Sequence, residues 1–325
     1  MSFPLHTPGY AVHGHSVDTG SDRFGPLVDS TAIVDESTTL RDRYQAEGYI
    51  FIKGLIDRDA VLAARREILL KYAMIGEIDD RHPLDDAVEG NRAGLATANL
   101  RAFTESVRTG AHYEAVIFDH RLLSVVGAIL DGPVQPYTFR WPRLVRHGEG
   151  CGFHCDGPYM SRGTDRHLST WIPLGAVPPE QSGLMILEDS HVNPDLHAGY
   201  LQKDADRDGL VWLDDDPAAV QDRYGRRWLT ASYEPGDVLI FSMNTLHGAS
   251  DNITDRCRLS TDSRYLVEGE IGDPRWNGDG ELAPHGEGRV FYPGLGSWAN
   301  ADFQDEWKYV DENGRLLLGD SGSSS

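Results

Sequence analysis

The chain has 325 residues, and its 30 Lys plus Arg against 51 Asp plus Glu give a formal net charge of −21. A chain this acidic repels phosphate backbones and anionic lipid surfaces, so we expect no nucleic-acid partner and no membrane partner. Hydrophobic residues make up 40% of the sequence, which is typical of a globular protein with a core of its own. Three cysteines and the absence of a signal-peptide pattern predict a cytoplasmic protein.

The sequence divides into three expected parts. Residues 1–38 are rich in Gly, Ser, Asp, Pro and His without periodicity, and we expect an N-terminal arm. Residues 39–268 carry the regular patterns and predict the main domain. Residues 269–325 are rich in aromatic residues, so we expect an extension that packs on the core, with a disordered tail near 319–325.

The first half of the chain predicts helices. Asp57 is placed to cap a helix whose apolar residues recur at helical spacing as far as about Ile75. Other helices are expected over residues 40–48, 100–107 and 112–130, and a short strand over 49–52.

After residue 133 the pattern changes to short β-rich runs between Gly, Pro and Asp breaks. Such spacing is typical of a sandwich or barrel and not of alternating strands and helices. The fold class is therefore mainly β with flanking helices. The runs cover residues 137–146, 168–174, 184–187, 228–232, 238–241 and 257–267.

A possible metal site lies in the segment GCGFHCDGP, residues 150–158. His154 and Asp156 are two residues apart, a spacing that places both side chains on one face of an extended strand. His247 follows the apolar run 238–241 and can supply a third ligand. Two imidazoles and one carboxylate hold one face of an octahedral Fe(II) and leave positions open, so we predict an iron site.

Arg258 and Ser260 are also two residues apart and share a strand face. A guanidinium and a hydroxyl on one face make an anchor for a carboxylate. An open metal site beside such an anchor suits a 2-oxo acid that chelates the metal and leaves its far carboxylate to the arginine.

Taken in order, these motifs resemble the phytanoyl-CoA dioxygenase family of Fe(II)/2-oxoglutarate oxygenases over roughly residues 40–268. The resemblance implies a double-stranded β-helix (jelly-roll, cupin-like) core with iron on the two histidines and the aspartate. It also implies that Arg258 and Ser260 bind 2-oxoglutarate and that Trp171 lines its pocket. The matching segments are RYQAEGYIFIKGLIDRDAV, HCD, STWIPLG, SGLMILEDSH, YEPGDVLIFSMNTLHGASDN and RLSTDSRY.

The resemblance implies that 2-oxoglutarate and O2 are consumed, with release of succinate and CO2. We expect hydroxylation of an aliphatic C–H in a small polar metabolite or a natural-product intermediate. The charge of −21 disfavours an acyl-CoA substrate. Desaturation, cyclisation or epimerisation at the same iron remains open. Two other classes also remain open, namely a cupin-like metalloenzyme without 2-oxoglutarate and a non-catalytic binding protein. Replacing Arg258 tests the first, because activity and 2-oxoglutarate binding would then be unchanged.

Three residues near the metal motif are candidates for the substrate side. Arg143 lies on the run before the motif, Tyr159 follows Asp156 closely, and Arg162 comes shortly afterwards. Arg143 would touch the co-substrate or the substrate, and Tyr159 would form a wall. In an acidic protein, arginines here serve equally well as salt-bridge partners. The motifs leave the substrate and the oligomeric state open.

Overall fold

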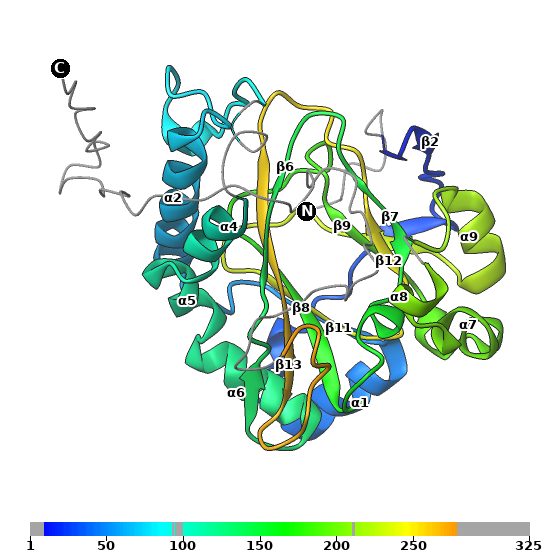
Figure 1. Cartoon of the computed structure of the whole chain (residues 1–325). Helices are drawn as coiled ribbons and strands as arrows, with labels where there is room; N and C mark the ends of the chain where they lie inside the picture. Colours follow the sequence, from blue (N-terminus) through cyan, green and yellow to red (C-terminus); the bar gives the residue numbers. More distant parts are fainter. Residues whose placement is uncertain (1–9, 93, 95–99, 210–211, 278–325) are drawn as a thin grey trace, which may run out of the picture.

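The computed structural model describes residues 10–92, 94, 100–209 and 212–277, and its main feature is two β-sheets (Figure 1). The large sheet has the order β4 (Tyr49–Ile52), β11 (Val238–Ser242), β8 (His167–Pro173), β13 (Arg258–Val267) and β5 (Val134–Pro136), with β6 (Trp141–Val145) also paired to β13. The small sheet has the order β3 (Phe24–Pro26), β10 (Trp228–Thr230), β9 (Leu184–Leu187), β12 (His247–Ala249) and β7 (Cys151–His154).

The two sheets face each other, and neither is closed into a barrel. An apolar cluster joins their inner faces, with Trp171 and Leu239 from the large sheet and Ile186 and Leu229 from the small one. Every residue of β8 and of β13 is buried. β13 is buried although its sequence, RLSTDSRYLV, is rich in polar residues, so these side chains must find their partners inside the protein.

Helices cover the outer face of each sheet. On the large sheet, α2 (Arg58–Met74), α5 (Ala111–Ile117) and α6 (His120–Leu130) contribute to one large apolar cluster. On the small sheet, α7 (Pro194–Ala198) and α9 (Pro217–Tyr224) pack on the opposite side of the molecule (Figure 1). The other α-helices of the described ranges are α1 (Ser37–Glu47), α4 (Leu100–Arg108) and α8 (Ala205–Asp208).

The helix predictions are confirmed with one correction. Asp57 caps α2 by accepting a hydrogen bond from the backbone N–H of Ala60 at 2.9 Å. The single helix that we predicted over 112–130 is wrong, because the chain forms two helices there. Asp119 caps the second one by accepting from the N–H groups of Arg121 and Leu122.

The structure describes a hairpin near the N-terminus but little of the expected C-terminal extension. Near the N-terminus, β1 (Ala11–Val12) and β2 (His15–Ser16) form a hairpin that lies against the body of the protein. The description ends at Asn277, so most of the expected C-terminal extension, including the tail near 319–325, lies outside the described residues.

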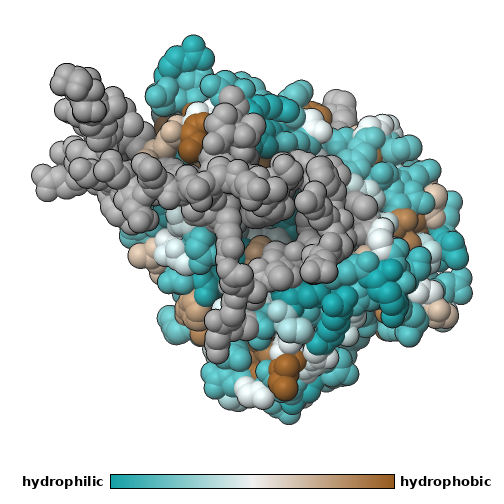
Figure 2. All heavy atoms as spheres, in the orientation of Figure 1, coloured by the Kyte–Doolittle hydropathy of each residue, from teal (hydrophilic) through white to brown (hydrophobic). Residues whose placement is uncertain are grey.

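The outer surface is predominantly hydrophilic on the face shown in Figure 2, where apolar residues are scattered among polar ones. Within the described ranges, no helix combines the length and the apolar character that crossing a bilayer requires.

Candidate active site

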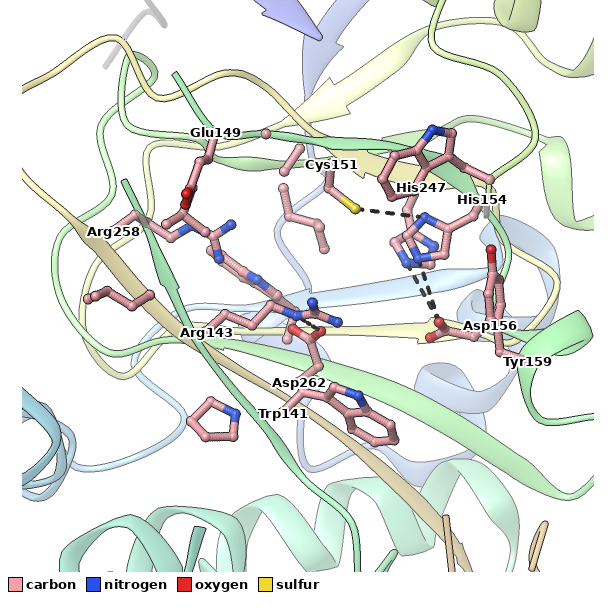
Figure 3. A pocket seen from close by; sticks show the side chains of 18 of the residues that line it. Trp141, Arg143, Glu149, Cys151, His154, Asp156, Tyr159, His247, Arg258 and Asp262 are labelled. Atoms are coloured by element: carbon pink, nitrogen blue, oxygen red, sulfur yellow. Dashed lines mark hydrogen bonds and ion pairs between the residues drawn. The ribbon is translucent and has the colours of Figure 1, made fainter. Parts of the chain in front are cut away.

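A cavity of about 480 Å³ lies between the two sheets and takes lining residues from both. At one end are the three predicted metal ligands, His154, Asp156 and His247. At the other end is Arg258, with Arg143 between the two ends (Figure 3). The fold therefore brings both predicted motifs into one cavity.

Two of the three metal ligands come from neighbouring strands of the small sheet. His154 is the last residue of β7 and His247 is the first of β12, and the two face each other in the register of the sheet. Nε2 of these imidazoles lies 3.8 and 4.0 Å, respectively, from Oδ1 of Asp156. All three ligand atoms lie within 4.8 Å of one another, which is the spacing that one bound ion needs.

Asp156 reaches this position by a different route from the one we predicted. Our prediction that Asp156 shares a strand face with His154 is wrong, because β7 ends at His154. Asp156 has helical backbone angles, φ −71° and ψ −25°, at the start of a 3-10 turn over Gly157–Tyr159. The turn, and not the alternation of a strand, directs the carboxylate towards the imidazoles.

Backbone carbonyls set which nitrogen of each imidazole donates a hydrogen bond. Nδ1 of His154 lies 2.9 Å from the carbonyl oxygen of Gly152, and Nδ1 of His247 lies 3.0 Å from that of Thr245. A carbonyl oxygen only accepts, so each Nδ1 carries the proton and donates it. Each Nε2 is then left with a lone pair that can bind a metal ion between the three ligand atoms, as metal-binding histidines require.

The electrostatics of the site keep the ligands ready for a cation. Burial alone would raise the pKa of the Asp156 carboxyl, but the Arg264 guanidinium and the hydrogen bond from the Ser169 hydroxyl hold that pKa far below its usual range. Burial also lowers the pKa of His247 and favours its neutral form. Two imidazoles and one carboxylate fit a divalent iron, which such a set binds with positions left open.

Arg258 forms the anion-binding end of the cavity. Its side chain is 4% exposed, and its Nη atoms donate to the hydroxyls of Ser260 and Ser182, the latter at 3.5 Å. Within the described residues its Nε has no hydrogen-bond partner, and the Trp171 ring lies 5.7 Å from Cζ. Burial lowers its pKa to about 10, so the guanidinium remains charged at neutral pH. A buried cation held by neutral hydroxyls attracts a carboxylate.

Two of the three expected substrate-side residues lie at the cavity. Arg143 lines it, and its Nε donates to the carboxylate of Asp262. Tyr159 lines it as well, with its ring edge-on to His154 at 5.7 Å between centroids. Arg162 is not among the lining residues. Its guanidinium donates to Asp204, at 2.7 Å, in a network outside the cavity.

Sequence reasoning missed several residues of the cavity. Asp262 and Arg264 continue the inward face of β13 beyond Ser260, and both line the cavity. The signal was present in the motif RLSTDSRY, where every second residue points the same way. Trp141, Trp212, Trp276 and His13 also line the cavity, and no local motif marked them.

Comparisons with known proteins agree with this geometry. The model of the phytanoyl-CoA dioxygenase (PhyH) family matches residues 44–260, about two thirds of the chain. A 1-deoxypentalenic acid 11-beta-hydroxylase from Streptomyces exfoliatus is 24% identical over 260 residues, covering 75% of this chain and 86% of that protein. Its namesake from Streptomyces arenae is 25% identical over 262 residues, with the same coverage.

Solved structures confirm the jelly-roll, cupin-like fold. The α-ketoglutarate-dependent carbocyclase SnoK of nogalamycin biosynthesis has a TM-score of 0.54 at 17% identity, covering 83% of this chain and 98% of that one. The epimerase SnoN in complex with Fe3+, α-ketoglutarate and nogalamycin RO has a TM-score of 0.52 at 19% identity, covering 88% and 97%. From the family match and the fold, we conclude that the chain belongs to the phytanoyl-CoA dioxygenase family and is an oxygenase.

Proposed function

We propose that the protein is a non-haem Fe(II)/2-oxoglutarate-dependent oxygenase that hydroxylates an aliphatic C–H of a small natural-product intermediate. His154, Asp156 and His247 hold the iron, and Arg258 with Ser260 holds the distal carboxylate of 2-oxoglutarate. The bound iron supplies oxidation by O2, coupled to the decarboxylation of 2-oxoglutarate to succinate and CO2. The chain itself supplies ligands, an anion site and a cavity that shields the reaction from water.

The observation that carries this proposal is Arg258, a buried cation at the opposite end of the cavity from the metal ligands. Its described hydrogen-bond partners are hydroxyls of Ser260 and Ser182 and include no carboxylate. Such a site supports binding of a molecule that chelates the metal at one end and places a carboxylate on Arg258 at the other. It disfavours a cupin-like metalloenzyme that makes no use of a 2-oxo acid.

The substrate side of the cavity is aromatic. Trp141 and Trp276 lie with ring centroids 5.0 Å apart and line the cavity together with Tyr159 and Met160. Aromatic and thioether side chains bind apolar bodies. This wall favours a natural-product substrate with a hydrocarbon skeleton over a small polar metabolite.

The test is an anaerobic titration of the protein with Fe(II) and then with 2-oxoglutarate, followed by absorption spectroscopy. Chelation of iron by the 2-oxo acid is expected to give a visible charge-transfer band. Charged hydrogen bonds contribute about 1.5–3 kcal/mol each, so Arg258→Gln is expected to weaken 2-oxoglutarate binding roughly 10- to 100-fold. Arg162→Gln, outside the cavity, is the matched control and should titrate as the wild type does.

Substrate turnover is read from succinate release, with 1-deoxypentalenic acid as the first compound and a fatty acyl-CoA as the contrast. Product structure then separates hydroxylation from desaturation, cyclisation and epimerisation, which use the same cavity. If the wild-type protein binds Fe(II) but gives no band with 2-oxoglutarate, the proposed function is wrong.

A further inference from the structure

The two carboxylate oxygens of Asp156 lie in different surroundings. Oδ1 faces Nε2 of His154 at 3.8 Å and Nε2 of His247 at 4.0 Å. Oδ2 instead accepts a hydrogen bond from Nη2 of Arg264 at 2.7 Å and another from Oγ of Ser169 at 2.5 Å. Resting on the proposed function, we infer that Arg264 and Ser169 form a carboxylate clamp that leaves the metal only Oδ1 of Asp156.

The carboxylate clamp joins the two sheets. Asp156 follows β7 of the small sheet, whereas Arg264 on β13 and Ser169 on β8 belong to the large sheet. Arg264 and Ser169 are direct register partners, and they are only 4% and 0% exposed. The large sheet thus presents two donors side by side to a carboxylate that reaches across from the other sheet.

The turn that begins at Asp156 aims its carboxylate but gives it no further hold, because the Asp156 side chain makes no capping hydrogen bond to the turn Gly157–Tyr159. A carboxylate that offers both oxygens would occupy two positions on a metal. With Oδ2 held by Arg264 and Ser169, one position stays available for the co-substrate or O2, and the ligand keeps its orientation.

Arg264 itself is placed for this one contact. The Trp141 ring covers its guanidinium at 4.3 Å from Cζ, and Asp156 is its ion-pair partner among the described residues. Within the same part of the chain its Nε and Nη1 have no hydrogen-bond partner. Burying a cation on so few contacts costs free energy. A guanidinium also repels a nearby metal cation, so its benefit to metal binding must come from orienting Asp156.

The test uses Co(II) as the probe, with the dissociation constant from competition against a chromophoric chelator and the ligand field from the visible spectrum. Loss of a group that holds a metal ligand in place typically costs about 10- to 100-fold in metal affinity, so we expect a loss of that size for Arg264→Met, together with an altered Co(II) spectrum. Ser169→Ala, a smaller change, should shift both in the same direction. Arg140→Met removes another buried guanidinium, one that pairs with Glu114 away from the cavity; it is the matched control and should bind Co(II) as the wild type does.

Two roles of Arg264, orienting Asp156 and acting only through its charge, predict opposite changes in Co(II) affinity for Arg264→Met. If Arg264 acted only through its charge, removing it would tighten Co(II) binding and leave the spectrum unchanged. That outcome, or a wild-type affinity and spectrum in both clamp variants, would overturn the clamp. A wild-type protein that binds Co(II) without binding 2-oxoglutarate would instead refute the proposed function and leave the clamp result standing. Failure of the wild-type protein to bind Co(II) would overturn both.

Discussion

His154 and His247 face each other directly across the antiparallel pair β7 and β12, with ring centroids 4.3 Å apart. The distance between the two metal ligands is therefore set by the distance between two strand backbones. The next residue of β12, Gly248, is part of this arrangement. A Cβ on Gly248 would lie 2.8 Å from the backbone oxygen of Cys151 and 2.7 Å from the Phe153 ring.

The first prediction follows from that close approach. Gly248→Ala is expected to push β12 away from β7, separate the two imidazoles and weaken metal binding at least about tenfold, an effect comparable to loss of a supporting contact. Co(II) titration measures it. Gly183→Ala is the matched control, because a Cβ there meets its neighbours only at 3.5 Å or beyond. Equal Co(II) affinities for the two variants would contradict the prediction.

Much of the site could be predicted from the sequence because its key side chains follow local rules. Arg258 and Ser260 lie two residues apart on a regular strand, and they meet as that spacing predicts. The order of motifs also placed His247 with the other ligands. For His154 and Asp156 the same rule gave the right partners for a wrong reason, because a turn begins between them.

The remaining residues could not be predicted because they depend on contacts between distant segments. Arg264 reaches Asp156 only because β13 and β7 lie in opposite sheets. His13 reaches the cavity only because the N-terminal hairpin folds back on the body of the protein. The short strands β3 and β12 have three residues each, too few for a periodic pattern to identify them.

A second prediction concerns the buried ion pair between Arg146 and Glu77. Nη2 of Arg146 lies 2.6 Å from Oε2 of Glu77, and the two side chains are 8% and 0% exposed. Glu77→Gln removes the buried carboxylate and leaves Arg146 only the more exposed Glu149, at 3.1 Å, so we expect a loss of about 1–3 kcal/mol in the free energy of unfolding. Glu234→Gln breaks the pair with Arg58, whose side chains are 61% and 58% exposed, and should cost less than about 1 kcal/mol. Urea denaturation measures both, and similar losses in the two variants would count against the prediction.

A third prediction concerns pH and His167. Burial lowers the pKa of His167 to about 4, and its Nδ1 shares a hydrogen bond of 2.7 Å with the Tyr137 hydroxyl. Between pH 6.5 and 4 the unfolded chain binds a proton at this site that the folded chain does not. The free energy of unfolding therefore falls as the pH drops through this window, by roughly 3 kcal/mol in total from this group.

His167→Gln should remove that contribution. Urea denaturation of the metal-free protein at several pH values between 7 and 4 measures it. The wild type is expected to lose stability more steeply than His167→Gln across the window. Parallel curves for the two proteins would show that His167 is not the group responsible.

The last prediction concerns the N-terminal hairpin, β1 and β2, which brings His13 to the cavity. Its turn is held by the Asp251 carboxylate, which accepts the backbone N–H groups of His13 and Gly14 at 2.9 Å each. Asp251→Asn replaces the charged acceptor and its two equivalent oxygens with a neutral amide that has a single acceptor. Charged hydrogen bonds contribute about 1.5–3 kcal/mol each, so the hairpin amides are expected to exchange with solvent roughly tenfold faster or more. Hydrogen exchange with mass spectrometry measures this over residues 11–17.

Asp18→Asn, which alters a local contact to the N–H of Gly20 in the same segment, is the control. If Asp251→Asn leaves exchange in the hairpin unchanged, Asp251 does not hold it, and the position of His13 at the cavity depends on its other contacts, to Asp215 and Trp212.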